Sequence, residues 1–225
     1  FGVSLNTVRR DLDALEEQGI LRRTQGGAIL QEFGHFAQPF HVRKTEYSKE
    51  KEAIGLAAAK LVAENDTIII DAGTTTQQVA RNLGGLQCLT VLTNSLEVAN
   101  DLLPNANLTV ILSGGVLRQP SRSTVGMPAE QFFSQFHVDK AFIGVGGISV
   151  ETGLTNPNIH ETPVKRKMIE AAREVIVVAD HHKFEQVSLS PIAPISVVHK
   201  IVTDAQTSEA TIKKFTALGI EVIVA

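Results

Sequence analysis

The sequence has little cysteine, no net positive charge and no long apolar run, and each shortage excludes a class of protein. Its single cysteine, Cys88, excludes a disulfide framework and agrees with a reducing cytosol. The formal net charge of −3 gives no overall basic bias, so any contact with nucleic acid has to come from a local patch. No stretch approaches the roughly 18 consecutive apolar residues of a membrane span. We therefore expect a cytoplasmic protein with no membrane partner.

The sequence does contain ample material for a folded core. Hydrophobic residues make up 43% of the 225 residues and charged residues 20%, which is the balance of an ordinary globular protein. This length is enough for one large domain or two small ones. The chain begins at Phe1, inside what proves to be a motif, and we expect the N-terminus to be incomplete.

Three regions of the chain differ in pattern. Residues 1–30 are helical in pattern and contain several arginines, whereas residues 31–47 show no clear period and contain Gly34 and Pro39. From Ser48 onward, apolar runs alternate with helical patterns. We expect a small N-terminal domain over 1–30, a linker over 31–47 and a larger domain over 48–225.

The larger domain has the pattern of a sheet covered by helices. It opens with a helix from Ser48, a plausible N-cap, followed by short apolar strands separated by further helices. The predicted strands are 67–71, 88–93, 108–113, 140–145, 175–179, 199–203 and 220–224, and the predicted helices are 75–83, 95–103, 127–136, 161–173 and 207–218. Continuous apolar strands separated by helices indicate a mostly parallel sheet. We predict an α/β domain of three layers and Rossmann-like type.

The first thirty residues predict one helix and one hairpin. Ser4 can cap a helix from Leu5 to Gln18, Gly19 can end it, and its apolar residues Val8, Leu12 and Leu15 share one face. The following "ILRRTQGGAIL" predicts a β-hairpin with a polar tip. This is the outline of a truncated winged helix-turn-helix whose first helices are missing.

Such a helix can enter the major groove of DNA while the hairpin holds flanking phosphates. The alternative is that Arg9 and Arg10 pair with Asp13 and nearby acids on a solvated helix. The helix cap, the single apolar face of the helix, the arginines and the Gly-Gly hairpin occur together, and this combination favours DNA binding over a solvated helix. The candidate DNA-binding residues are Ser4, Asn6, Thr7, Arg9, Arg10, Arg22, Arg23, Gln25 and Gly26.

The stretch "DAGTTT" at 71–76 joins a predicted strand to a predicted helix. The free N–H groups of a first helical turn and the helix dipole form an anion site, which Gly73 and the threonines Thr74, Thr75 and Thr76 would complete. Asp71 suits a sugar hydroxyl better than a phosphate. The alternative is a capped helix whose threonines bond only to the backbone. The stretch has neither a P-loop lysine nor a G-x-G-x-x-G pattern, so a nucleotide is not the natural ligand.

Other strand ends supply polar groups at the same edge of the sheet, where ligands of open α/β sheets gather. The candidates there are Thr93, Asn94, Ser95, Gly114, Gly115, Arg118, Glu161, Lys165, Asp180 and Lys183. Arg118, Lys165 and Lys183 can neutralise a phosphate, and Glu161 and Asp180 can bond hydroxyls. A structural ion pair is the alternative for Asp180 and Lys183. His181 and His182 lack the spacing of a metal site, so we expect no metal and no cofactor.

The stretch "GVSLNTVRRDLDALEEQGILRRTQGGAIL", with "DAGTTT", "TNS" and "SGGVLR", resembles the DeoR family of bacterial transcription regulators. That resemblance covers the whole chain. It implies a repressor that binds operator DNA through a winged helix and a phosphorylated sugar through its α/β domain. It also implies a homodimer or homotetramer, because two DNA-binding domains in one oligomer double the number of DNA contacts.

The α/β region is also similar to ribose-5-phosphate isomerase, and an isomerase-like enzyme is the alternative function. The segment that carries that enzyme's carboxylates corresponds here to "IGVGG", with Ile143 and Gly146 where acids would be needed, and its helix glutamate to Arg166. The carboxylates Asp71, Glu161 and Asp180 remain. A coenzyme A-type acyl carrier enzyme is a weaker third reading, because no glutamate nucleophile stands in a recognisable setting. We expect a receptor and not an enzyme.

Overall fold

The computed structural model of the protein describes residues 2–17, 21–24, 26–30 and 38–225. Gln18, Gly19, Gln25 and Gly34, named above, lie outside the described residues. Over residues 2–30 the predicted helix and hairpin are confirmed, as α1 (Leu5–Glu17), β1 (Leu21–Thr24) and β2 (Gly27–Leu30). The backbone N–H of Thr7 donates to Ser4 Oγ at 3.2 Å, so Ser4 caps α1 as expected.

The larger domain is built on a parallel sheet of seven strands in the order β14-β13-β11-β8-β3-β4-β5. These strands are β3 (Thr67–Ile70), β4 (Thr90–Thr93), β5 (Thr109–Leu112), β8 (Val138–Gly144), β11 (Ala172–Val178), β13 (Lys200–Thr203) and β14 (Glu221–Val224). Each of the seven predicted strands matches one of them. From β3 the chain adds strands first toward β5 and later toward β14, so the strand order reverses between β3 and β8.

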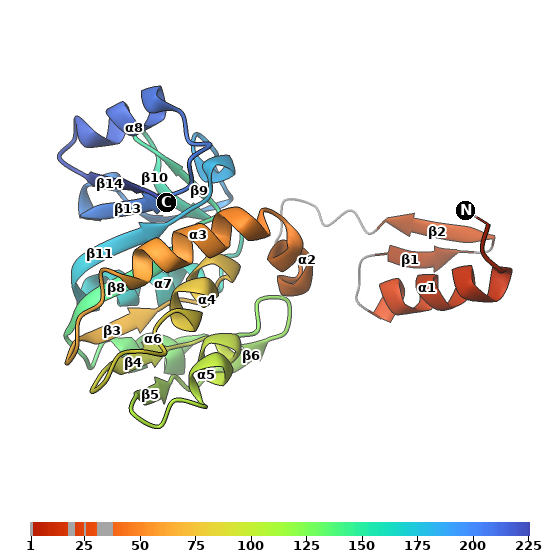
Figure 1. Ribbon diagram of the computed structural model, residues 1–225, viewed down its shortest axis with the longest axis horizontal. Helices are drawn as coiled ribbons and strands as arrows, with labels where there is room; N and C mark the ends of the chain where they lie inside the picture. Colours follow the sequence, from red (N-terminus) through yellow and green to blue (C-terminus); the bar gives the residue numbers. More distant parts are fainter. Residues whose placement is uncertain (1, 18–20, 25, 31–37) are drawn as a thin grey trace.

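Helices cover both faces of this sheet (Figure 1). They are α3 (Ser48–Ala59), α4 (Thr74–Arg81), α5 (Leu96–Leu102), α6 (Met127–Phe133), α7 (Thr162–Ala171) and α8 (Glu209–Thr216). On β3, Ile68 and Ile70 pack with the cluster under α3, α4 and α5, whereas Ile69 packs with the cluster under α6, α7 and α8. Successive side chains of a strand point to opposite faces of the sheet, so the apolar residues of one strand pack into the hydrophobic cores on both faces. The predicted three-layer fold is confirmed.

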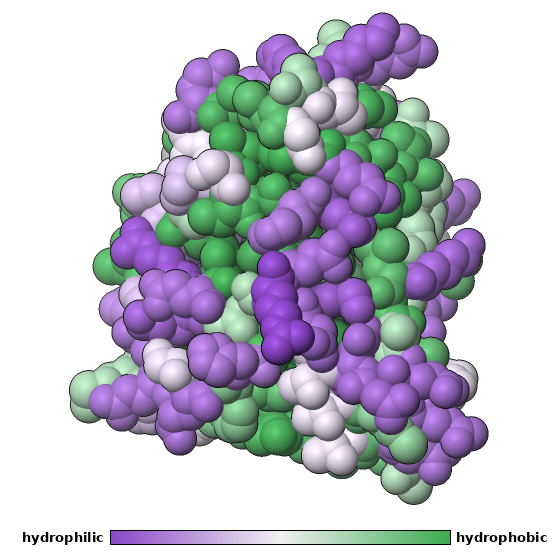
Figure 2. Space-filling model, turned by 90° about the vertical axis from the view of Figure 1, so that its left-hand side faces the viewer, coloured by the Kyte–Doolittle hydropathy of each residue, from purple (hydrophilic) through white to green (hydrophobic). Residues whose placement is uncertain are grey.

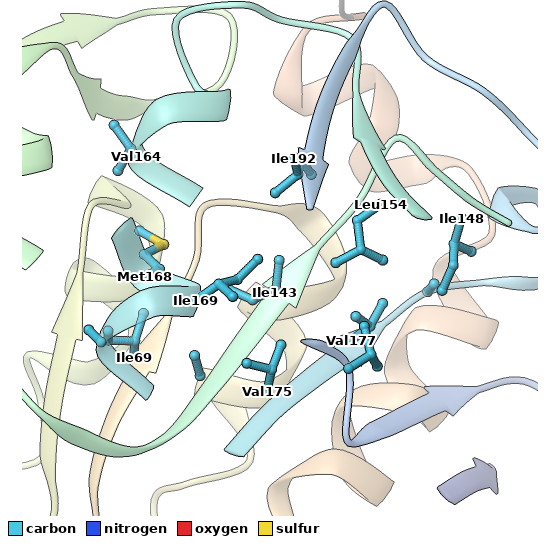
Figure 3. Packing of buried hydrophobic residues seen from close by; sticks show 14 of the residues in the cluster. Ile69, Ile143, Ile148, Leu154, Val164, Met168, Ile169, Val175, Val177 and Ile192 are labelled. Atoms are coloured by element: carbon cyan, nitrogen blue, oxygen red, sulfur yellow. The ribbon is translucent and has the colours of Figure 1, made fainter. Parts of the chain in front are cut away.

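Short antiparallel elements complete the domain. A three-stranded sheet joins β9 (Gly147–Ser149), β10 (Gly153–Asn156) and β12 (Ser190–Ala193), and a hairpin joins β6 (Val116–Arg118) to β7 (Ser123–Val125). Two 3-10 turns are η1 (His181–Lys183) and η2 (Ile195–Val197). Figure 3 shows Ile148, Leu154 and Ile192 of the three-stranded sheet beside the core residues of β8 and β11. The small sheet therefore extends the core under α7.

Two expectations about the start of this domain need correction. The N-cap of α3 is Tyr47 and not Ser48; Tyr47 has a left-handed backbone with φ of 51° and makes no side-chain cap. The end of the region expected to be a linker also holds a helix, α2 (Phe40–Thr45), whose Phe40 is buried. A six-residue helix is too short to show a period in the sequence, which is why the pattern missed it. The domain boundaries themselves stay a prediction.

The surface of the domain mixes hydrophobic and hydrophilic residues. Figure 2 shows both kinds interspersed over the face that lies at the left of Figure 1. Scattered exposed apolar side chains are ordinary for a globular protein. Among the described residues, no helix is long and apolar enough to cross a membrane. The expected homodimer or homotetramer stays a prediction.

Candidate anion-binding site

A cavity of about 550 Å³ lies where β3, β8 and β11 end. This is the edge of the sheet at which the strand order reverses, the usual place of a ligand in an open α/β fold. The cavity is lined by Gln38, Arg43, Glu46, Tyr47, Lys51, Ala72, Gly73, Thr74, Thr75, Gly144, Val145, Gly146, Asn156, Pro157, Glu161, Lys165, Val178, Ala179, Lys183 and Ser188. Six of the sequence-predicted residues are among them: Gly73, Thr74, Thr75, Glu161, Lys165 and Lys183.

One wall of the cavity is the N-terminus of α4. Gly73 is the N-cap in extended conformation and provides no side-chain cap, so the first N–H groups of α4 lack an intrahelical partner. Thr74 and Thr75 line the cavity, whereas the fully buried Thr76 donates its hydroxyl to Gly73 O at 3.0 Å. The helix end thus presents backbone donors and two hydroxyls to the cavity. Thr76 bonds only to backbone, as the alternative interpretation had it.

A buried ion pair forms the floor of the site. Lys165 Nζ contacts Asp71 Oδ2 and donates to Gly144 O at 2.9 Å, and the N–H of Gly144 donates to the same Asp71 oxygen at 3.0 Å. Both side chains are at most 4% exposed. Burial raises the pKa of Asp71, while the ammonium of Lys165 opposes that shift. Asp71 therefore joins β3 to β8 beneath the cavity and does not line it.

Three cations of the cavity wall, Arg43, Lys51 and Lys183, make no ion pair within the part of the chain that the structure describes. They come from α2, α3 and η1. Burial lowers the pKa of the Arg43 guanidinium, with Glu161 the largest charge opposing that shift. Cations that make no direct ion pair are the usual setting for a bound anion. Glu46 and Glu161 also line the cavity, but within the described residues neither makes an ion pair with these three cations.

Lys51 is the most enclosed of these cations, at 5% exposed. Its ammonium donates to Arg43 O at 2.5 Å and to Glu46 O at 2.7 Å, two carbonyls at the C-terminal end of α2. Burial lowers its pKa to about 8; Asp180 opposes the shift, and the charge of Lys183 adds to it. Lys51 thus remains mostly protonated at neutral pH, and its charge has no carboxylate in contact.

Lys51 also lies beside the start of α4. Gly55 packs so closely on Gln78 that an added Cβ would come within 2.3 Å of the Gln78 Cβ. Because α3 and α4 each run antiparallel to β3 between them, they are parallel to each other. Lys51 lies one helical turn before Gly55 on α3, and Thr74 lies one helical turn before Gln78 on α4. Both Lys51 and Thr74 line the cavity. The lysine and the open helix end therefore serve one site.

Glu161 lies on the opposite wall in a network of its own. Its Oε1 accepts from Arg118 Nη1 at 3.1 Å and its Oε2 from Asn156 Nδ2 at 3.3 Å. Arg118 also donates to Ser121 Oγ at 3.2 Å and does not line the cavity. The guanidinium of Arg118, which we expected to neutralise a phosphate, is thus already bonded to the carboxylate of Glu161. Its place in the structure is to orient Glu161.

Five other predicted residues lie away from the cavity. Thr93 donates its hydroxyl to Ile70 O at 2.6 Å, Asn94 accepts from the N–H of Ala72 at 3.2 Å, and Ser95 caps α5. Gly114 and Gly115 lie before β6 and do not line the cavity; a Cβ on Gly115 would meet Val125 O at 2.6 Å. Thr93 and Asn94 therefore hold the end of β3 in place, and Ser95 stabilises the start of α5.

The segment after β11 contains Asp180, which is fully buried. Its Oδ1 accepts from the N–H of His182 at 3.2 Å, and its Oδ2 has no partner among the described residues. The structural ion pair with Lys183, the alternative interpretation of these two residues, does not form. His181 Nδ1 lies 3.0 Å from Asp204, and His182 Nε2 lies 2.6 Å from the hydroxyl of Tyr47. Within the described residues, no cluster of three or more His, Cys, Asp or Glu residues could hold a metal ion.

The N-terminal residues predicted to bind DNA lie mostly on the surface. Asn6, Arg9 and Arg10 are exposed on α1, and Gly26 is exposed with a φ of +94° at the hairpin tip. Asp13 contacts Arg23, and within the described residues Arg9 and Arg10 make no ion pair of the kind that the solvated-helix alternative required. Arg23 itself is held against α1. The side chain of Arg22 lies outside the described residues.

The sequence interpretation missed polar cavity residues from several segments. Gln38, Arg43, Glu46, Tyr47 and Lys51 come from the chain before β3, Asn156 comes from β10, and Ser188 lies just before β12. Lys51 could have been noticed, because it shares the buried helix face of Ile54 and Ala58 at i+3 and i+7. A lysine on such a face needs a partner or a function. No comparable signal marks the α2 residues.

Comparisons with known proteins match both parts of the chain. Residues 46–205 match the DeoR C terminal sensor domain, and residues 1–32 match the DeoR-like helix-turn-helix domain. The HTH-type transcriptional repressor GlcR of Bacillus subtilis is 39% identical over 222 residues, covering 99% of this chain and 85% of that protein. The Glycerol-3-phosphate regulon repressor of Escherichia coli is 38% identical over 205 residues, covering 91% and 81%.

Among solved structures, ribose 5-phosphate isomerase A of Methanocaldococcus jannaschii matches with a TM-score of 0.46 and 18% identity, over 62% of this chain and 55% of that one. The family matches extend over both the helix-turn-helix and the α/β domain, and the relatives match along nearly the whole chain. The chain belongs to the DeoR family of transcriptional regulators.

Proposed function

We propose that this regulator is a repressor whose α/β domain binds a phosphorylated sugar in the cavity at the end of β3, β8 and β11, and that this binding changes its affinity for operator DNA. The observation that carries the proposal is the convergence of the open N-terminus of α4 with Arg43, Lys51 and Lys183 on one cavity. The phosphate is the anion that this donor set suits.

A phosphate fits this donor set because it has three acceptor oxygens and nearly two negative charges at neutral pH. The first-turn N–H groups of α4 and the hydroxyls of Thr74 and Thr75 can donate to it, as helix N-termini do to phosphates elsewhere. Lys51 and Lys183 supply the neutralising charge. The sequence has no P-loop pattern, which favours a small phosphorylated molecule over a nucleotide.

The rest of the cavity suits the hydroxyls of a sugar. Glu161, Asn156 and Ser188 line it with acceptors and donors on the side away from Lys51's helix. Arg118 holds Glu161 in place, so its carboxylate can accept from a hydroxyl, while its charge also acts on Arg43. The name of one relative, Glycerol-3-phosphate regulon repressor, mentions a small phosphorylated molecule and agrees with a ligand of this kind.

We further propose that the site binds without catalysing isomerisation. Asp71 and Glu161 are each held by a cation, and Asp180 does not line the cavity. A side chain at Gly146 would come within 2.5 Å of Pro157 Cδ and 2.6 Å of Ser188 Oγ, so a carboxylate has no room there. Proton transfer from carbon needs a free, positioned base, and none of these groups provides one.

Operator binding is assigned to α1 and the β1–β2 hairpin. The exposed Arg9 and Arg10 supply phosphate or base contacts, and a homodimer or homotetramer would place two such elements on two half-sites about one helical turn, roughly 34 Å, apart. The whole protein is expected to work in the cytoplasm, where operator DNA and phosphorylated sugars meet.

A thermal-shift screen with phosphorylated sugars tests the ligand class. A ligand that binds only the folded state stabilises it by about 2.7 kcal/mol at a hundredfold excess over Kd. For a chain of this size that raises Tm by about 5–11 °C. The matched control is the same sugar without its phosphate, which should give no shift. Equal shifts with both forms, or none with any phosphorylated sugar, would refute the proposal.

A further inference from the structure

The segment of residues 38–47, which contains α2 and is here called the strap, connects the two domains along the chain and also walls the cavity. Gln38, Arg43, Glu46 and Tyr47 line the cavity from this segment. The strap follows residues 31–37, which join it to the N-terminal domain, and it leads directly into α3. Figure 1 shows α2 beside the start of α3. Any ligand in the cavity therefore lies against the chain that leads to the DNA-binding domain.

The strap is docked at both of its ends. At its start, Phe40 is 2% exposed, its N–H donates to Pro120 O at 2.8 Å, and the guanidinium of Arg122 lies 5.7 Å from its ring. At its end, the hydroxyl of Tyr47 lies 2.6 Å from His182 Nε2, and the two rings are 3.9 Å apart. One anchor is the turn of the β6–β7 hairpin and the other is η1. Each anchor combines an aromatic ring contact with one hydrogen bond, and the anchor at Phe40 buries its ring almost completely.

Between these anchors the strap is held by the charges of the proposed anion site. Lys51 binds the strap through the carbonyls of Arg43 and Glu46, which leaves the third hydrogen of its ammonium for another acceptor. Arg43 uses its Nε to donate to Gln38 O at 3.0 Å, and its other donors have no hydrogen-bond partner among the described residues. Donors from the strap and from its anchor lysine thus face the same cavity.

Charges of both signs surround the ammonium of Lys51, and Asp180 exerts the largest effect among them. Arg43 and Lys183 both act on Lys51 as repelling charges, and Asp180 and Glu46 act on it as attracting ones. An anion placed among the three cations would accept from Arg43 and Lys51 together and remove their mutual repulsion. Docking of the strap would then gain the contacts of the ligand, whereas undocking would lose them.

We propose that the strap is part of the ligand site: Arg43 binds the anionic group of the effector directly, and occupancy fixes the strap in its docked position through Arg43, Lys51 and Tyr47. This inference rests on the proposed function and adds which element carries the signal. A ligand shifts a conformational equilibrium only by its different affinity for the two states, and contacts made by Arg43 exist only when the strap is docked.

Hydrogen–deuterium exchange of the backbone amides of residues 38–47, measured in the intact protein, tests this proposal. Inorganic phosphate is the probe, and chloride at equal ionic strength is the control. Phosphate should slow exchange of the amides of residues 38–47 by at least severalfold. Arg43→Gln should weaken phosphate binding about tenfold, measured by calorimetry, whereas Lys44→Gln on the same helix should change it less than twofold. Lys44 does not line the cavity.

The outcomes separate this proposal from the proposed function. Phosphate binding with unchanged exchange over 38–47, or equal affinities of Arg43→Gln and Lys44→Gln, would overturn the role of the strap and leave the sugar-phosphate site standing. Absence of phosphate binding, together with a negative screen of phosphorylated sugars, would overturn both. Tyr47→Phe keeps the ring and removes the hydroxyl; it should fold, bind phosphate more weakly and protect 38–47 less. Full protection in this variant would contradict the anchor at His182.

Discussion

The Asp71–Lys165 pair gives the sharpest test of the site's architecture, because it joins β3, β8 and α7 beneath the cavity. Lys165→Met keeps the volume of the aliphatic stem and removes the ammonium. Asp71 then keeps only the N–H of Gly144 as a donor, although it is 1% exposed. Removing one partner of a buried pair costs about 3–5 kcal/mol, because it leaves a buried charge uncompensated. For a protein of this size the expected drop in Tm is roughly 6–20 °C.

A double-mutant cycle attributes this loss to the pair. Asp71→Asn combined with Lys165→Met leaves no buried charge, and the asparagine can still accept from Gly144. The double variant should therefore be less destabilised than the sum of the single variants, with a coupling of about 1–3 kcal/mol in urea unfolding. Lys167→Met, on the same helix but in an exposed pair with Glu170, should change stability by less than about 0.5 kcal/mol.

The sign of the pH dependence provides an independent check. Without Lys165 the pKa of Asp71 should rise further above its unfolded value, because burial is no longer opposed. A raised folded pKa makes the folded state relatively more stable at low pH, and that stability is lost as pH rises through the folded pKa. The penalty of Lys165→Met should thus be smaller near pH 4 than near pH 7.5. A penalty below 1 kcal/mol at pH 7.5, or one independent of pH, would refute the reasoning.

The remaining predictions concern ligand and operator. Lys183→Gln should weaken binding of a phosphorylated sugar about 10- to 100-fold in calorimetry, the value of a hydrogen bond to a charged group, while the exposed Lys213→Gln serves as control; equal affinities would remove Lys183 from the site. Affinity should fall above pH 8 by up to about tenfold per pH unit, because Lys51, with a pKa of about 8, loses its charge there. Lys51→Arg keeps the positive charge, so the affinity of this variant for the phosphorylated sugar should not fall between pH 8 and pH 9.5. A wild-type affinity that stays constant up to pH 9.5 would contradict the role of Lys51. In the full-length protein, Arg9→Ala should weaken operator binding and make its salt dependence shallower, whereas an unchanged gel-shift affinity would exclude Arg9.

The sequence predicted the central sheet well for a physical reason. Parallel strands buried on both faces are continuous apolar runs, such as "TIII" at 67–70, and β3, β4 and β13 are each followed directly by a helix with its own period. The short antiparallel strands β6, β7, β9, β10 and β12 were not predicted. They have three or four residues each, and β10 pairs with β12 across more than thirty residues of chain, so no local pattern marks them.

The candidate site was predicted in its location and only in part in its composition. Loops at one edge of a parallel sheet meet by topology, which is why Thr74, Lys165 and Lys183 come together. Thr93 and Asn94 belong to the same edge, but their side chains bond to the backbone of neighbouring strand ends. Whether a polar side chain turns inward or toward the cavity depends on contacts that single-sequence patterns do not contain.

The contribution of the strap could not be predicted at all. Its helix is short and depends on tertiary contacts, above all the burial of Phe40 and the bonds from Lys51 to Arg43 O and Glu46 O. In the sequence, residues 31–47 show no period and contain Gly34 and Pro39, which is typical of a connection. Its position beside the cavity follows only from the fold.

The central claim is that a phosphorylated sugar in this cavity controls operator binding. The most direct measurement is the affinity of the full-length protein for operator DNA, by fluorescence anisotropy, with and without a phosphorylated sugar that saturates the α/β domain. The account predicts a change of about 5- to 150-fold, corresponding to a coupling of about 1–3 kcal/mol, and no change with the unphosphorylated sugar. An operator affinity that is the same with the saturated and the empty α/β domain would contradict it.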